Sequence, residues 1–270
     1  LFWSWWAANS GYGFTHNNIN LENIVLQRPL LEKAKMTFLV SNGDFTDYRK
    51  DIILSNIPTF INFDASSMLN INTQTNNLQS IKTMSPEILS YKVLNKTSTD
   101  VKRDACDVWS LTLTIFSFQT HNNTTVLEYV GKQHQKKYRY DFFKEMTRGI
   151  LFPTLLDETK QEEIFTFMQI FFLQRGLRDR FGTFPPEKLL SSGYYNKRIF
   201  TKQLRNNIYK FDAKYGLYKA YKQFFINVIP VNIQDLVRDW LDWDPNVRTN
   251  NGNFIGKIMK HLVKRANSGL

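Results

Sequence analysis

The alternation of apolar and polar positions indicates a mainly α-helical protein with a few short strands. Residues 105–118 are apolar on nearly every side, which is typical of a helix buried on all faces. Residues 162–174 predict a second buried helix, capped upstream by Asp157, and the apolar run within it is too short to cross a membrane. Residues 200–228 carry apolar side chains mostly at three- and four-residue steps, which predicts one long amphipathic helix. Shorter helices are expected at residues 1–9, 138–149, 231–240 and 253–266.

Strand-like patterns occur in the first quarter of the chain. Residues 24–26 and 59–63 are apolar and predict two short strands. Between them, residues 27–58 contain the apolar stretch 36–40 followed by an Asn-Gly-Asp turn. This segment is therefore predicted to be a small hairpin insertion. The first helix is expected to stop at Gly11 and Gly13.

Composition and charge narrow the class of protein. The chain has 270 residues, of which 42% are hydrophobic and 22% charged, as in a soluble globular protein. Its 35 Lys and Arg against 24 Asp and Glu give a formal charge of +11, which suits nucleic acid or an acidic protein partner. The single cysteine, Cys106, excludes an internal disulfide and is typical of a reducing compartment. An intracellular, cytoplasmic protein without a membrane span is expected.

The stretch 11–26 contains the most informative motif. It reads His16-Asn17-Asn18-Ile19, then Asn23 and an apolar strand, and it resembles the catalytic loop of eukaryotic-type protein kinases, His-Arg-Asp-Leu-x-x-x-Asn. Three further kinase-like motifs follow in family order, at residues 85–87, 107–111 and 241–248. The resemblance implies a protein-kinase-like C-terminal lobe over residues 1–270, with a hairpin insertion at 27–58, a helical insertion at 150–230 and no small N-terminal lobe.

The same resemblance implies that the catalytic site is not intact. In kinases the Asp of the loop accepts the substrate proton, whereas here Asn18 has a carboxamide that cannot do so. The loop residues His16, Asn18 and Asn23 are thus a degenerate catalytic set. The metal-binding Asp-Phe-Gly has two alternative registers: one begins at Asn62 and the other at Asp64.

In either register the Asp-Phe-Gly motif is incomplete, so a nucleotide site built on it would bind magnesium weakly. Asn23, Asn62 and Asp64 would be its remaining residues, and only Asp64 and Asn23 could bind a metal. No metal or cofactor is expected, with ATP and magnesium bound only if another segment supplies the small lobe.

Other matched positions imply structural roles. Glu87 should form a buried ion pair with Arg248, as in the kinase family. Asp107, in the motif that also contains Trp109, should accept hydrogen bonds from the backbone at His16 and Asn17. These residues are expected to stabilise the fold and to take no part in catalysis.

Three functions are compatible with these patterns. The first is a catalytically inactive, pseudokinase-type module with a binding or assembly role. The alternatives are a divergent serine/threonine kinase whose small lobe is missing from this sequence, and a basic structural protein that contacts nucleic acid. The loop, the insertion at 27–58 and the Asn-rich composition also resemble kinase-like proteins of large double-stranded DNA viruses, which implies a virion component or a viral replication site. A protein partner is expected at the start of the chain, through Trp3, Trp5 and Trp6, or at the basic helix 200–228.

Overall fold

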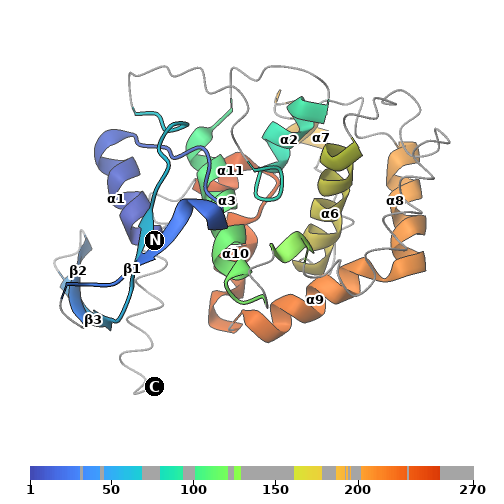
Figure 1. Cartoon of the computed structure of the whole chain (residues 1–270). Coiled ribbons are helices and arrows are strands. Elements are labelled where there is room, and N and C mark those ends of the chain that lie inside the picture. The colour runs from blue at the N-terminus through green and yellow to red at the C-terminus, as the bar shows by residue number, and fades with distance from the viewer. Residues whose placement is uncertain are drawn as a thin grey trace.

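The computed structural model describes residues 1–30, 33–42, 46–68, 80–93, 101–120, 125–128, 161–177, 187–191, 193, 195, 202–229 and 231–249. Across these residues the protein is mostly helical, with two small antiparallel sheets, so the predicted mainly α class is confirmed (Figure 1). The helices predicted at 138–149 and 253–266 lie outside the described residues, as does the Asp157 cap.

The elements follow one another along the chain in a fixed order. The helices are α1 (Phe2–Tyr12), α2 (Pro86–Val93), α3 (Arg103–Ser117), α6 (Gln161–Leu177), α7 (Glu187–Leu190), α8 (Lys202–Tyr215), α9 (Leu217–Val228), α10 (Gln234–Trp240) and α11 (Pro245–Thr249). The strands are β1 (Ile24–Gln27), β2 (Ala34–Asn42), β3 (Thr46–Leu54) and β4 (Ile57–Phe60). Short 3-10 turns span Leu21–Asn23 and Val231–Ile233.

Helix α3 forms the centre of the fold (Figure 1). Its residues from Ala105 to Thr114 are all buried, which confirms the prediction of a helix covered on every side. The hydroxyls of Thr112, Thr114 and Ser117 each donate to the carbonyl four residues earlier, at 2.7, 2.7 and 2.8 Å. These internal hydrogen bonds give each of the three hydroxyls a partner inside the apolar core.

Helix α6 packs closely against α9. The helix covers the predicted range 162–174 and is buried along most of its length. A Cβ at Gly176 would lie 2.7 Å from Cβ of Tyr221 and 2.8 Å from the backbone nitrogen of Lys222. The absence of a side chain at residue 176 therefore allows the two helix backbones to approach each other.

The prediction of a single helix over residues 200–228 is wrong. The chain forms α8 and α9, which run in different directions on either side of Gly216, whose φ is 64° (Figure 1). The left-handed backbone at Gly216 ends α8, and its N–H donates to the carbonyl of Asp212 at 2.6 Å. The buried carboxylate of Asp212 accepts the N–H of Tyr218 at 3.0 Å and forms an ion pair with Arg175. Apolar periodicity continues through both helices, so it does not reveal the break.

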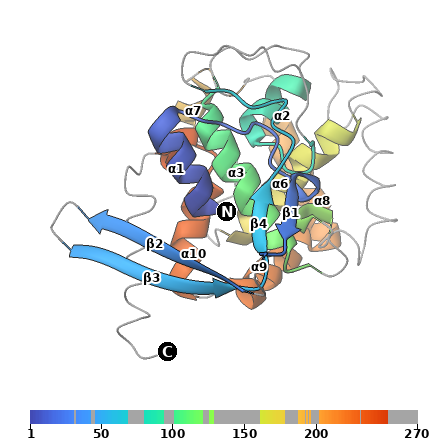
Figure 2. The same ribbon diagram turned by 60° about the vertical axis from the view of Figure 1, so that its left-hand side comes forward.

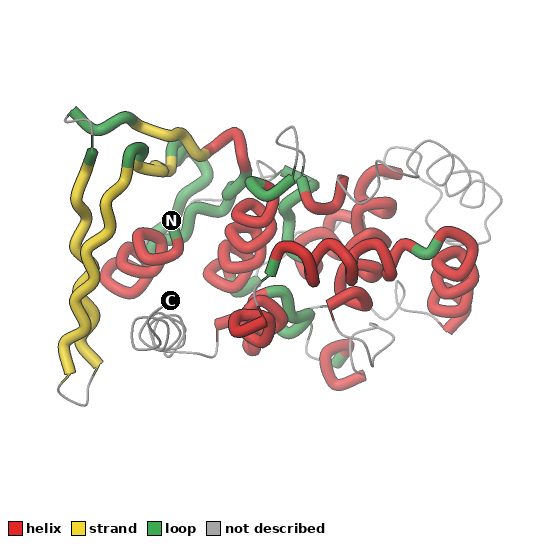
Figure 3. The backbone as a smooth tube through the Cα atoms, turned by 90° about the horizontal axis from the view of Figure 1, so that it is seen from below, coloured by secondary structure: helices red, strands yellow, loops and turns green. Residues whose placement is uncertain are grey.

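The strands form two separate pairs. β1 pairs antiparallel with β4, from Ile24 opposite Phe60 to Gln27 opposite Ile57, so the second strand starts earlier than the predicted 59–63. β2 pairs antiparallel with β3, from Ala34 opposite Leu54 to Asn42 opposite Thr46, within the segment predicted to be a hairpin. This ribbon extends away from the helices (Figure 2) and lies at the opposite end of the molecule from α8 (Figure 3).

The start of the chain differs from the prediction in two respects. α1 runs through Gly11 to Tyr12, and Gly13 alone ends it, with φ of 59°. Trp5 is only 4% exposed and its indole Nε1 donates to Oδ2 of Asp107 at 2.9 Å, so it cannot serve as an exposed docking residue. Trp6 is half-buried against the core, and the side chain of Trp3 lies outside the described part. The face of α1 that carries Trp5 is covered because it packs onto the interior of the same chain.

Candidate functional site

Asp107 of α3 binds the loop at residues 15–23 through hydrogen bonds to its backbone. Asp107 is 1% exposed, and its two carboxylate oxygens accept the backbone N–H of His16 at 2.6 Å and of Asn17 at 2.9 Å. Both predicted contacts are therefore present, and the indole of Trp5 adds a third donor. Burial raises the pKa of Asp107 to about 7, and the three donated hydrogen bonds limit that rise.

Asparagine side chains fill the position where the sequence predicts a degenerate catalytic loop. Oδ1 of Asn18 accepts from Nδ2 of Asn20 at 3.1 Å and from the backbone N–H of Ser80 at 3.3 Å. Asn23 donates from Nδ2 to the carbonyl of Asn18 at 2.8 Å, and Asn62 donates from Nδ2 to Oδ1 of Asn23 at 3.2 Å. We call Asn18, Asn20, Asn23 and Asn62 the asparagine cluster.

The contacts that Asn20 and Ser80 make in the structure are not predicted by the sequence motifs. The Oδ1 of Asn20 accepts the backbone N–H groups of Glu22 and Asn23 at 2.9 and 3.2 Å, and so caps the 3-10 turn that carries Asn23. An Asn directly before the Leu-Glu-Asn turn is a capping signal that could have been recognised. Ser80 has no such local signal, because it reaches Asn18 from 62 residues away.

The cluster is electrically neutral and cannot act as a base. Carboxamides donate and accept hydrogen bonds, but they do not take up a proton near neutral pH. Asn62 and Asp64 are both exposed, but the side chain of Asn62 donates to Asn23, which is the contact expected of the register that begins at Asn62. Over the described ranges, no group of three or more His, Cys, Asp or Glu residues could hold a metal ion.

Two asparagines at the site, Asn17 and Asn62, have a left-handed backbone conformation. Asn17 and Asn62 have φ of 59° and 60°, and within the described residues no other non-glycine residue has positive φ. Asparagine tolerates this left-handed region better than most residues. The side chain of Asn17 also donates to the carbonyl of Ala65 at 2.9 Å and to Oγ of Ser67 at 3.1 Å. The loop shape is thus maintained by polar contacts that need no carboxylate in the cluster.

His16 is a neutral structural residue in this loop. Its side chain is fully buried, its ring lies 5.5 Å from that of Phe60 and 5.3 Å from that of Phe63, and Nε2 is 3.1 Å from the carbonyl of Ile61. A carbonyl only accepts, so the contact assigns the proton to Nε2 and leaves Nδ1, which is buried without a hydrogen-bond partner, unprotonated. Burial accordingly lowers the pKa of His16.

This assignment predicts acid sensitivity of the fold. Because the folded-state pKa of His16 lies below its ordinary value of 6.5, the unfolded chain binds the proton more readily. The stability that His16 contributes is fully present above the unfolded-state pKa of 6.5, and it is lost as the pH falls through the lowered pKa of the folded state. We expect wild-type protein to lose stability relative to His16→Phe on acidification, as measured by urea unfolding over a pH series. A difference between the two proteins that does not change with pH would contradict the assignment.

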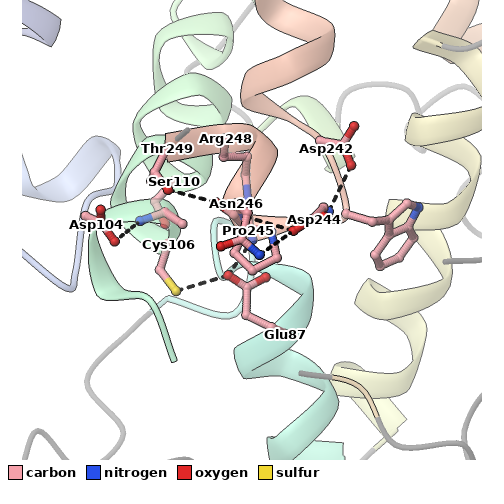
Figure 4. Close-up of polar contacts among 12 residues, drawn as sticks. Glu87, Asp104, Cys106, Ser110, Asp242, Asp244, Pro245, Asn246, Arg248 and Thr249 are labelled. Atoms are coloured by element: carbon pink, nitrogen blue, oxygen red, sulfur yellow. Dashed lines mark hydrogen bonds and ion pairs between the residues drawn. The ribbon is translucent and has the colours of Figure 1, made fainter. Parts of the chain in front are cut away.

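A second predicted contact joins Glu87 of α2 to Arg248 of α11 (Figure 4). Both side chains are fully buried, and Nη2 of Arg248 lies 2.5 Å from Oε1 of Glu87. The thiol of Cys106 donates to the same oxygen at 3.2 Å, and burial raises the pKa of Cys106 well above its ordinary value. The guanidinium carbon of Arg248 lies 5.6 Å from the ring centroid of Trp109. The pair thus joins α2, α3 and α11 inside the core, with no access to solvent.

The turn before Arg248 is ordered by its own carboxylates (Figure 4). Oδ1 of Asp242 accepts the backbone N–H of Asp244 at 2.8 Å, and Oδ1 of Asp244 accepts that of Asn246 at 2.9 Å. These bonds start α11 and orient Arg248 towards Glu87. The motif at residues 241–248 therefore has a structural function in this fold.

Among the described residues, no helix has the length and apolarity needed to cross a membrane. Comparisons with protein-family models, curated proteins and solved structures found no match to this chain. The kinase-like lobe therefore stays a prediction from the sequence motifs.

Proposed function

We propose that this chain is a catalytically inactive, kinase-like C-terminal lobe that acts as a binding or assembly module for a protein partner. The observation that carries the proposal is the contrast between a preserved anchor and an altered site. Asp107 holds the backbone at His16 and Asn17, while the position of the catalytic carboxylate is occupied by Asn18.

The contacts of Asn18 explain why phosphoryl transfer is not the favoured activity. Transfer of a phosphoryl group needs a residue that orients the nucleophile and carboxylates that hold magnesium beside the phosphates. Oδ1 of Asn18 already accepts two hydrogen bonds from the protein, and Asn62 donates to Asn23 instead of presenting an anionic oxygen to a metal. The polar groups at these positions are thus neutral and already take part in hydrogen bonds within the protein.

An assay of nucleotide binding and transfer tests the inactive state. We expect Mg·ATP to leave the melting temperature of the wild-type protein unchanged and to yield no phosphorylated product with a general protein substrate. Asn18→Asp/Asn62→Asp, which places carboxylates at both altered positions, is the matched variant that shows whether the geometry still supports the reaction. Transfer of the γ-phosphate by the wild-type protein would overturn the proposal in favour of a divergent kinase.

The binding role needs a separate measurement. We expect the tagged protein, purified from its native source, to retain a stoichiometric protein partner. Its recovery should survive Asn18→Asp, which leaves the anchor intact, and fall with Asp107→Ala, which releases the loop. Asp104→Ala, three residues earlier on α3, controls for general damage to that helix. The absence of a partner, or recovery that does not depend on Asp107, would count against a role for the preserved loop in binding.

A further inference from the structure

The outward side of α8 is strongly basic. Its exposed charged side chains are Lys202, Arg205, Lys210 and Lys214, which we call the α8 basic face. The acidic residue of this helix, Asp212, is buried and forms an ion pair with Arg175 of α6. Asp212 is the one acidic residue in the sequence of α8, so the exposed charged side chains of this helix are all cations.

The composition of the same surface indicates the class of partner. The large apolar residues Leu204, Ile208 and Phe211 are buried, and the uncharged exposed residues between the cations are Asn206 and Ala213. A protein interface usually has apolar or aromatic anchors at its centre, and a membrane-surface helix inserts large apolar side chains. Of the α8 side chains that the structure describes, no large apolar one is exposed, and the aromatic residues Tyr209 and Tyr215 are only partly exposed. Cations and small polar groups without such anchors suit a phosphate backbone.

We propose that the α8 basic face binds the phosphate backbone of nucleic acid without sequence preference. At 1.5 Å per residue, Lys202 and Lys214 are separated by about 18 Å along the helix. A duplex carries one charge per roughly 1.7 Å of its axis, so about ten phosphates lie within that length. The helix is thus long enough for its cations to contact separate phosphates.

The position of α8 makes this surface independent of the asparagine cluster. Figure 3 shows α8 at one end of the molecule and the β2–β3 ribbon at the other, and Figure 1 shows the helices α3 and α6 between α8 and α1. Bound nucleic acid on α8 would leave the loop at residues 15–23 uncovered. The inference therefore holds whether or not the kinase-like proposal does.

The test is the binding of a fluorescein-labelled DNA duplex, followed by fluorescence anisotropy at increasing salt. With about four phosphate contacts, the affinity of wild-type protein should fall roughly 100-fold between about 50 and 200 mM salt. The α8 variant Lys202→Gln/Arg205→Gln/Lys210→Gln should bind at least about tenfold more weakly and show a shallower salt dependence. The matched control Arg28→Gln/Lys33→Gln/Lys102→Gln removes the same charge from exposed positions away from α8 and should bind nearly as wild type does.

Several outcomes would overturn the proposal. Equal weakening by the two triple variants would mean that only net charge matters. Binding to polyglutamate that depends on α8, together with DNA binding that does not, would instead indicate an acidic protein partner. Circular dichroism shows whether each variant is folded. If the α8 variant is not, the single change Lys210→Glu at an exposed position replaces it, with a several-fold loss of DNA affinity expected and no loss contradicting the proposal.

Discussion

Replacement of Arg248 by Met is expected to lower the free energy of unfolding by about 3 to 5 kcal/mol. Arg248 and Glu87 are both fully buried, and the variant would leave the carboxylate of Glu87 in the core without its cation. The thiol of Cys106 would remain as a hydrogen-bond donor to Glu87, but a neutral thiol does not replace a positive charge. Urea unfolding followed by circular dichroism measures the loss.

Two controls separate the stranded charge from simple loss of packing. The double variant Glu87→Leu/Arg248→Met removes both charges and should be more stable than Arg248→Met alone, because no buried ion is left unpaired. Arg238→Met disrupts an ion pair with Asp235 in which both side chains are substantially exposed, and it should cost less than about 1 kcal/mol. A double variant no more stable than the single one would show that the charge is not the cause.

Replacement of Asp107 by Ala is expected to cost about 3 kcal/mol and to release the loop at residues 15–23. Three buried donors lose their acceptor together, namely the indole N–H of Trp5 and the backbone N–H groups of His16 and Asn17. Each unsatisfied buried donor costs roughly 1 to 3 kcal/mol, and the total is reduced when water enters the space left by the carboxylate.

Hydrogen exchange gives a local readout of the same change. The amide protons of His16 and Asn17 should exchange much faster in Asp107→Ala than in wild-type protein. Asp104→Ala is the matched control because Asp104 lies on the same helix and, among the described residues, its carboxylate accepts the neighbouring N–H of Ala105 and none from the loop. Unchanged protection of the two loop amides in Asp107→Ala would mean that Asp107 does not hold the loop.

The local pattern predicted the type of most described elements but not all of their ends. α3 and α6 are recognisable because they carry apolar residues on nearly every side, which is typical of a buried helix. Apolar residues recur with the same steps in α8 and α9, so the pattern gives no sign of the break at Gly216. Glycine allows a left-handed backbone but does not require it, so the break depends on how α9 packs against α6.

At the candidate site, too, some contacts could be expected from the sequence and others could not. The resemblance to the kinase family implied the two contacts of Asp107 and the pair of Glu87 with Arg248, and all of these are present. The asparagine cluster could not be predicted in the same way, since its members are individually ordinary polar residues. Asn62 reaches Asn23 across 39 residues of chain, and that distance is bridged only because β4 pairs with β1.

The amino-acid sequence by itself determined the mainly helical class, the buried central helix, the basic charge and the presence of Asn18 in a loop that resembles a kinase catalytic loop. These properties depend on residue type and on neighbours within a few positions, where periodicity and capping act. Only the tertiary structure decided that Trp5 is covered by its own chain, that Asn62 rather than Asp64 contacts Asn23, and that the cations of α8 face solvent. Burial and hydrogen bonding between distant residues depend on the path of the whole chain, which no local pattern specifies.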